Sequence, residues 1–253
     1  MAILSSTEFG ILHLSISRLQ KRNAINADMF DTLTDTLSHA AKDDTVRVVL
    51  LQGEEPIFSA GADLEEMKSS PEELDRAMST FFSVLRTFPK PIVAKIKGPC
   101  VGEAFIMLLY CDLVYASDKA LFSLPSVALG RTSRFGAAAI MAASAGITQA
   151  AEKLMLSEPI TAEEALSMRL ITAKVDDLSL DQLVANKVAR LTVLPPQAVQ
   201  STKMLLCTSR NQLLDQYLET EETVWRRQAQ SGEAAEALAA FLEGRKPIFR
   251  HDE

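Results

Sequence analysis

The stretch PIVAKIKGPCVGEAFIMLLYCDLVYA, residues 91–116, contains the pattern that decides the fold. Its residues 92–96 form an apolar run that is typical of a buried strand and that ends before a Gly-Pro pair. The apolar residues 103–110 predict a buried helix, and residues 112–115 predict a second strand. A strand, a glycine turn, a helix and another strand in this order are typical of an α/β domain.

Gly102 stands immediately before the predicted helix, where the absence of a side chain lets a ligand approach the backbone. The first N–H groups of a helix have no partner within the helix, and the helix dipole favours negative charge there. Such a turn can hold a phosphate, a carboxylate or an oxyanion. The same glycine could instead serve only the packing of a core helix, and the turn alone does not separate the two interpretations.

The residues before this stretch also alternate between strands and helices. Alternating apolar residues at 12–16 predict a half-buried strand, and the continuous apolar run at 46–51 predicts a strand buried on both faces. Asn26 is a suitable N-cap for a helix, and residues 71–88 predict another helix. Between these elements, the small residues of SAGADL, residues 59–64, give a ligand a second close approach to the backbone.

The residues after this stretch predict a long loop and then helices. Residues 118–136 contain two arginines and show few signals of regular structure, and loops of this length are often functional. From Ala137 onward the pattern predicts an almost wholly helical chain, whose last helix covers residues 232–243.

The composition places limits on the class of protein. The chain has 253 residues, 47% of them hydrophobic, and a formal net charge of −7. These values suit one large domain with or without an appended segment, and the acidic balance argues against nucleic acid as a partner. The sequence shows neither a signal peptide nor a run of about 20 apolar residues that could span a bilayer. We therefore expect a cytoplasmic protein without a membrane partner.

Cysteine and histidine usage indicates neither a disulfide framework nor a metal site. Both residue types are few and poorly spaced for zinc binding or for a histidine-based triad, and no metal is expected. They are Cys100, Cys111, Cys207, His13, His39 and His251.

Several short motifs, taken together with their order and spacing, resemble the crotonase superfamily, the enoyl-CoA hydratase/isomerase family. The resemblance extends over essentially the whole chain. The motifs are KRNAIN at 21–26, SAGADL at 59–64, GPCVGE at 98–103, CDLVYA at 111–116, ITAEEA at 160–165 and FLEGRKP at 241–247. The Gly-Pro pair and LGRT at 129–132 resemble the peroxisomal-type enoyl-CoA isomerases more than the mitochondrial hydratase.

The resemblance implies an α/β fold, a crotonase-like spiral of ββα repeats with a C-terminal helical trimerisation region. Residues 1–190 would form the spiral core that binds acyl-CoA. Residues 191–253 would form a helical region that packs on the core and on neighbouring subunits of a homotrimer or a dimer of trimers. Coenzyme A would enter as part of the substrate, and no other cofactor is implied.

The resemblance also implies an oxyanion hole, in which the backbone N–H groups of Ala62 and Glu103 bind the thioester oxygen. Loss of the α-proton leaves negative charge on that oxygen, and one such donor can be worth about 3–4 kcal/mol. Lys21 and Arg22 would contact CoA phosphates, whereas an ordinary solvated surface is the alternative for such basic residues. The full set of implied substrate-binding residues is Lys21, Arg22, Ala24, Ala60, whose carbonyl would meet the adenine, Gly61, Ala62, Asp63, Leu64, Gly102 and Lys246, which would reach the CoA of a neighbouring subunit.

The sequence departs from the family pattern where the hydratases have two glutamates. Those positions fall on Ile106 and Ser126, and the alternative position used by peroxisomal-type isomerases falls on Arg134. None of the three carries a carboxylate. Addition of water across a double bond then has no evident pair of proton donor and acceptor, which disfavours efficient hydratase activity and leaves hydration as an alternative.

Two charged residues remain as catalytic candidates. Glu103 could point away from the pocket as a helix N-terminal charge, or it could project inward and carry a proton. Arg134 could stabilise a carboxylate or an enolate, or it could be a surface arginine on a loop. The expected catalytic residues are Ala62, Glu103 and Arg134.

The leading functional prediction is an acyl-CoA enzyme that stabilises a thioester enolate and isomerises the double bond of an enoyl-CoA in fatty acid metabolism. Isomerisation needs only one group that carries a proton, so it tolerates the loss of a glutamate. The alternatives are another crotonase reaction (hydration, decarboxylation or thioester hydrolysis) and a non-catalytic acyl-CoA-binding subunit.

Overall fold

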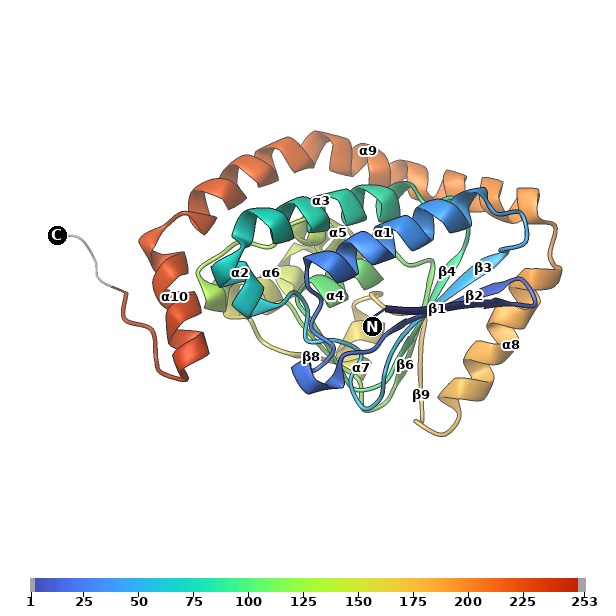
Figure 1. Cartoon of the computed structure of the whole chain (residues 1–253), viewed down its shortest axis with the longest axis horizontal. Helices are drawn as coiled ribbons and strands as arrows, with labels where there is room; N and C mark the ends of the chain where they lie inside the picture. The colour runs from blue at the N-terminus through green and yellow to red at the C-terminus, as the bar shows by residue number, and fades with distance from the viewer. Residues whose placement is uncertain (1–2, 250–253) are drawn as a thin grey trace.

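The computed structural model describes residues 3–249, which form two sheets with helices packed around them (Figure 1). The strands are β1 (Ile3–Glu8), β2 (Ile11–Ile16), β3 (Val48–Gly53), β4 (Ile92–Ile96), β5 (Pro99–Val101), β6 (Leu113–Ser117), β7 (Leu121–Ser123), β8 (Ile160–Thr161) and β9 (Ala173–Val175). The helices are η1 (Leu19–Lys21), α1 (Ala27–Lys42), α2 (Leu64–Ser69), α3 (Pro71–Thr87), α4 (Glu103–Leu108), η2 (Val127–Leu129), α5 (Ala137–Ala145), α6 (Ile147–Leu156), α7 (Ala162–Ser167), α8 (Leu180–Val193), α9 (Pro196–Ala229) and α10 (Gly232–Glu243).

The main sheet has the strand order β1-β2-β3-β4-β6-β9. β1 pairs with β2 antiparallel, and every later neighbour pairs parallel, with Val49 opposite Ile92 and Val93 opposite Leu113. Parallel neighbours require crossover connections, which the intervening helices provide. The predicted α/β architecture is confirmed.

Helices cover both faces of the main sheet, as the continuous apolar runs of β3 and β4 predict. On one face α8 packs against Val48, Val93 and Tyr115. On the other face lies the larger core, in which Phe30 of α1 and Phe81 of α3 contact each other. Figure 1 shows α1, α3 and α9 layered on that side of the sheet, and α8 on the opposite side.

The smaller sheet has the order β5-β7-β8, and the chain enters it directly after β4 of the main sheet. Cys100 pairs with Phe122, which in turn pairs with Ile160. This sheet therefore places the glycine turn after β5 beside the loop that follows β7.

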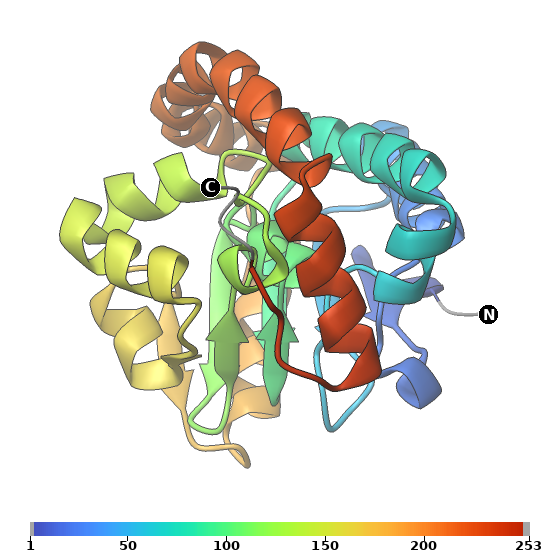
Figure 2. The same ribbon diagram turned by 90° about the vertical axis from the view of Figure 1, so that its left-hand side faces the viewer.

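The C-terminal helices return to the body of the molecule. The 34-residue α9 ends at Ala229, after which α10 turns back and contacts η2 and α2 (Figure 2). The division predicted between residues 190 and 191 falls inside α8, whose apolar side belongs to the sheet core. Of the residues predicted for the C-terminal region, 250–253 lie outside the described part of the chain.

Four sequence-based expectations about secondary structure are wrong in detail. The loop at 118–136 contains β7 and η2, and the region after Ala137 contains β8 and β9. These strands have only two or three residues, too few for a recognisable alternation of apolar side chains. β1 was not expected, because it is an exposed edge strand with polar residues on both faces. The helix expected to reach residue 110 ends at Leu108.

No helix within residues 3–249 has both the length and the apolar character required to cross a bilayer. In the same part of the chain, no cluster of three or more His, Cys, Asp or Glu side chains is arranged for a metal ion. His251, one of the three histidines, lies outside the described residues.

Candidate active site

Hydrogen bonds between three segments bring the two glycine-containing turns together. The N–H of Ser59 donates to the carbonyl of Pro99 at 3.2 Å, and the N–H of Val101 donates to the carbonyl of Ser59 at 2.9 Å. On the other side, the N–H of Ile25 donates to the carbonyl of Gly61 at 2.8 Å. The segments at 59–64 and 98–103, separated by about forty residues in the sequence, therefore meet at one point.

Asn23 fixes the conformation of the first turn from behind. It is fully buried, and its side-chain amide donates to the carbonyls of Glu54 and Ile57, both at 2.8 Å. The Ser59 hydroxyl donates to the carbonyl of Asn23 at 2.7 Å and accepts from the N–H of Gly61 at 3.0 Å. Because buried polar groups bonded in this way resist rearrangement, the backbone of the turn is held rigidly.

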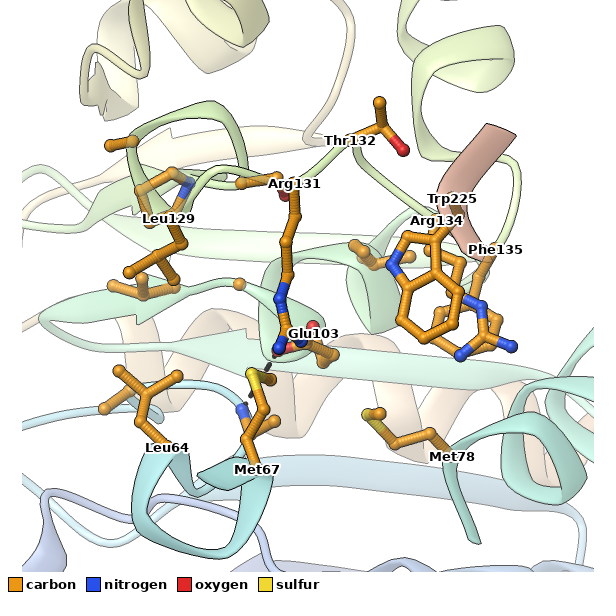
Figure 3. Close-up of a pocket in the computed structure, with 18 of the residues that line it drawn as sticks. Leu64, Met67, Met78, Glu103, Leu129, Arg131, Thr132, Arg134, Phe135 and Trp225 are labelled. Atoms are coloured by element: carbon orange, nitrogen blue, oxygen red, sulfur yellow. Dashed lines mark hydrogen bonds between the residues drawn. The ribbon is translucent and has the colours of Figure 1, made fainter. Parts of the chain in front are cut away.

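Glu103 faces the cavity beside this turn. It is the first residue of α4, and its carboxylate accepts a hydrogen bond from the N–H of Ala62 at 3.1 Å (Figure 3). The alternative in which this side chain points away from the pocket is therefore wrong. Its carboxylate oxygen takes the place on the Ala62 N–H that the family resemblance assigns to a thioester oxygen.

Gly61 is the residue that permits this close approach. Its φ is +91°, and a Cβ at this position would lie 2.7 Å from the carbonyl oxygen of Val101 and 3.3 Å from the Glu103 carboxylate. Gly146 is a matched control, because its φ is +85° and a Cβ there would meet nothing within 4 Å. Both alanine substitutions carry the cost of a positive φ, and only Gly61→Ala also brings a Cβ against other backbone atoms.

Gly61→Ala is therefore expected to lower the free energy of unfolding by about 2 kcal/mol more than Gly146→Ala, which is a typical cost of overpacking. Urea denaturation of the two variants measures the difference. Equal losses for both variants would show that the turn can move away from the new methyl group.

A cavity of about 170 Å³ lies between this turn and the loop after β7. Its wall is mainly apolar and comes from both the core and the C-terminal helices. The lining residues are Ala60, Ala62, Leu64, Met67, Met78, Val101, Gly102, Glu103, Ile106, Pro125, Ser126, Ala128, Leu129, Arg131, Thr132, Arg134, Phe135, Trp225 and Phe241. Sequence reasoning gave no role to Trp225 of α9, although it is the only tryptophan in the chain.

Arg134 is buried at one end of the cavity, so the alternative in which it is a surface arginine is wrong. Its guanidinium forms ion pairs with Asp75 of α3 and, at 2.9 Å, with Glu222 of α9. It also stacks 3.8 Å from the ring centroid of Trp225 and 4.7 Å from that of Phe135. Two carboxylates thus hold the guanidinium of Arg134, which joins the loop to two helices.

Arg131 and Thr132 precede Arg134 on the same loop and also line the cavity. Their Nε and Oγ1 atoms are buried and have no hydrogen-bond partner among the described residues. Burial lowers the pKa of Arg131, while the negative charges of Glu103 and Asp75 act in the opposite direction. Sequence reasoning included both residues in a motif but assigned them no role.

Comparison with protein-family models places residues 6–252 in one family, enoyl-CoA hydratase/isomerase. The chain belongs to the enoyl-CoA hydratase/isomerase family. The predicted resemblance to the crotonase superfamily is confirmed.

The names of the relatives in this family state different activities. The chain is 31% identical over 252 residues to enoyl-CoA delta isomerase 2 of Rattus norvegicus, and this match covers 97% of the chain but only 64% of the rat protein. It is 30% identical over 253 residues to 2,3-dehydroadipyl-CoA hydratase of Escherichia coli, with 98% of each protein covered. The chain spans slightly less than two thirds of the rat relative's length.

Solved structures of the family share this fold. An enoyl-CoA hydratase/isomerase from Pseudoalteromonas atlantica superposes with a TM-score of 0.92 at 28% identity, over 99% of this chain and 100% of that one. Pseudomonas aeruginosa OdaA superposes with a TM-score of 0.91 at 33% identity, over 95% and 98% of the two chains. The predicted crotonase-like fold is confirmed by these neighbours.

The two positions that the family resemblance assigns to the hydratase glutamates lie in the cavity wall. Ile106 is 1% exposed and Ser126 lies on the loop after β7, and both contact the cavity. Among the described residues that line the cavity, Glu103 is the only one with a carboxylate.

Only some of the other residues that the family resemblance assigns to CoA binding line the cavity. Ala60 and Leu64 line it, whereas Asp63 caps α2 through the N–H of Glu65 and forms an ion pair with Arg18 at 2.8 Å. The remaining residues lie outside the cavity wall. Arg22 is exposed, Ala24 is half-buried, Lys21 pairs with Glu65 at 2.7 Å and Lys246 is exposed after α10.

Glu221 of α9 is a buried acid behind the cavity. Its carboxylate accepts from the N–H of Gly136 at 2.9 Å, and burial raises its pKa from 4.5 to about 7. Between about pH 4.5 and pH 7 the unfolded chain releases this proton before the folded chain does. Stability therefore falls as the pH rises through this window.

Glu221→Gln is expected to remove this loss, because a neutral amide can still accept from Gly136. The variant should gain about 3 kcal/mol over the parent protein at pH 8 and almost nothing at pH 4.5. Urea denaturation at both pH values measures the gain. A gain that is equal at the two pH values would contradict the raised pKa.

Proposed function

We propose that this protein isomerises the double bond of an enoyl-CoA through a thioester enolate. The observation that carries the proposal is the position of Glu103, whose carboxylate lies in the cavity on the N–H of Ala62. A single carboxylate can take a proton from the α-carbon and return it to the γ-carbon, so that no water is consumed.

The proposed reaction begins with exchange of ligands at the oxyanion hole. The thioester oxygen replaces the Glu103 carboxylate on the N–H of Ala62, and the backbone N–H of Glu103 is the second donor. Because the α-carbon is bonded to the thioester carbonyl carbon, the displaced carboxylate remains beside the proton that it removes. Negative charge then develops on an oxygen that two fixed donors stabilise.

The proposal is supported by one of the relatives, which is named an enoyl-CoA delta isomerase. Another relative is named a hydratase. Hydration is less well supported for this chain, because Ile106 and Ser126 supply no second carboxylate for the attacking water.

Exchange of the α-proton tests the proposal. The protein is incubated in deuterated water with butyryl-CoA and with 3-hexenoyl-CoA, and deuterium at the α-carbon and movement of the double bond are followed by NMR. Catalysed exchange together with formation of 2-hexenoyl-CoA is the expected result. Tight binding of both thioesters without exchange would overturn the proposal and indicate a non-catalytic acyl-CoA-binding subunit.

A further inference from the structure

Arg131 and Arg134, both on the loop after β7, differ in whether other residues of the protein pair with their charges. Arg134 is held by Asp75, by Glu222 and by the ring of Trp225. Among residues 3–249, no carboxylate forms an ion pair with Arg131, and the Nε of Arg131 is buried without a hydrogen-bond acceptor. The Arg131 side chain is half-buried, and a buried donor such as its Nε destabilises the fold unless a ligand supplies an acceptor. Arg134 is therefore paired within the protein, whereas the side chain of Arg131 faces the cavity without a carboxylate partner in the described chain.

The surroundings of Arg131 indicate what the missing acceptor is. Figure 3 shows its side chain extending from the loop across the cavity toward Glu103. The hydroxyl of Thr132, the next residue, is also buried without a partner in the described chain. In Figure 3 the Thr132 side chain points away from the guanidinium of Arg131, so it is Arg131 that a ligand in this mainly apolar cavity would meet.

We infer that Arg131 forms a subsite for a carboxylate carried by the acyl group, so that the acyl-CoA bound in this cavity is the monothioester of a short dicarboxylic acid. A guanidinium binds a carboxylate through two parallel N–H···O bonds. Since Arg131 extends toward Glu103, the carboxylate lies only a few carbons from the thioester. The inference rests on the proposed function only in that the thioester occupies the Ala62 turn.

Glu103 is the other anion near Arg131, and it makes a competing explanation possible. Its charge acts on Arg131, yet its carboxylate oxygen is hydrogen-bonded to the N–H of Ala62. If Arg131 served only Glu103, its removal would change the binding of all acyl groups alike. A carboxylate subsite instead predicts a change that is confined to acidic acyl groups.

Matched pairs of saturated thioesters distinguish the two explanations. Succinyl-CoA is compared with butyryl-CoA, and glutaryl-CoA with valeryl-CoA, so that each pair differs only by a carboxylate in place of a methyl group. Isothermal titration calorimetry at fixed ionic strength gives the four dissociation constants. We expect the acidic member of at least one pair to bind at least fivefold more tightly.

Arg131→Met is expected to reduce this preference to less than twofold, while butyryl-CoA binding shows that the variant is folded. Arg190→Met, which removes an exposed arginine of α8, should leave it unchanged. A preference below fivefold in both pairs, or one that survives Arg131→Met, overturns the inference. Because no turnover is measured, failure here leaves the isomerase proposal intact, and absence of binding by all four thioesters would count against both.

Discussion

Glu103→Gln is expected to lower the rate of α-proton exchange by at least about a hundredfold, the usual contribution of a positioned general base. Glutamine keeps the shape of the side chain, and its amide oxygen can still accept from the N–H of Ala62. What it removes is the group that carries the proton. The rate is measured by NMR with butyryl-CoA in deuterated water, and the dissociation constant is measured separately.

The control for this experiment is Glu152→Gln, because Glu152 is an exposed acid on α6 outside the cavity wall. It should exchange the α-proton at the rate of the parent protein. If Glu103→Gln kept that rate as well, the base would have to be another group, and the proposed mechanism would be wrong even though the turn still bound the thioester.

Arg134→Met should cause a large loss of stability. Removal of one partner from a buried ion pair costs about 3–5 kcal/mol, because the other charge is left without compensation. Asp75 and Glu222 retain some contact with solvent, at 23% and 35% side-chain exposure, so a loss of about 3 kcal/mol is expected. The free energy of unfolding from urea denaturation measures this loss.

Arg76→Met provides the comparison, since Arg76 forms an ion pair with Asp31 at 2.7 Å on the surface. Surface pairs are worth about 0–1 kcal/mol, so this variant should change stability little. Similar losses of stability for the two arginines would show that the ion pairs of Arg134 do not stabilise the fold. The Arg134 guanidinium would then be free to bind a substrate.

Much of the fold could be predicted because its signals are local. The apolar run of β4 and the capped helix α10 have the same limits in the structure as in the sequence-based prediction. The side chain of Asn26 caps α1 as expected, through the N–H of Met29. By contrast, β9 has three half-buried residues, and its place in the sheet depends on pairing with Tyr115, 58 residues earlier, which no local pattern encodes.

The candidate site, like the fold, has some features with a local signal in the sequence and others that depend on distant residues. Spacing and motif were enough to select the Ala62 turn and the start of α4, because both depend on glycines next to strands. They could not give the direction of the Glu103 side chain, which depends on a donor 41 residues away. Nor could they show that Arg134 has partners 59 and 88 residues distant, whereas the Nε of its neighbour Arg131 has no acceptor in the described chain.

The contribution of α9 and α10 to the cavity has a consequence for biosynthesis. The wall begins with Ala60 and is completed by Trp225 and Phe241. A nascent chain that has already folded its main sheet on the ribosome would still have one side of the cavity open. That side of the cavity is therefore closed only after α10 has emerged from the exit tunnel and docked on η2.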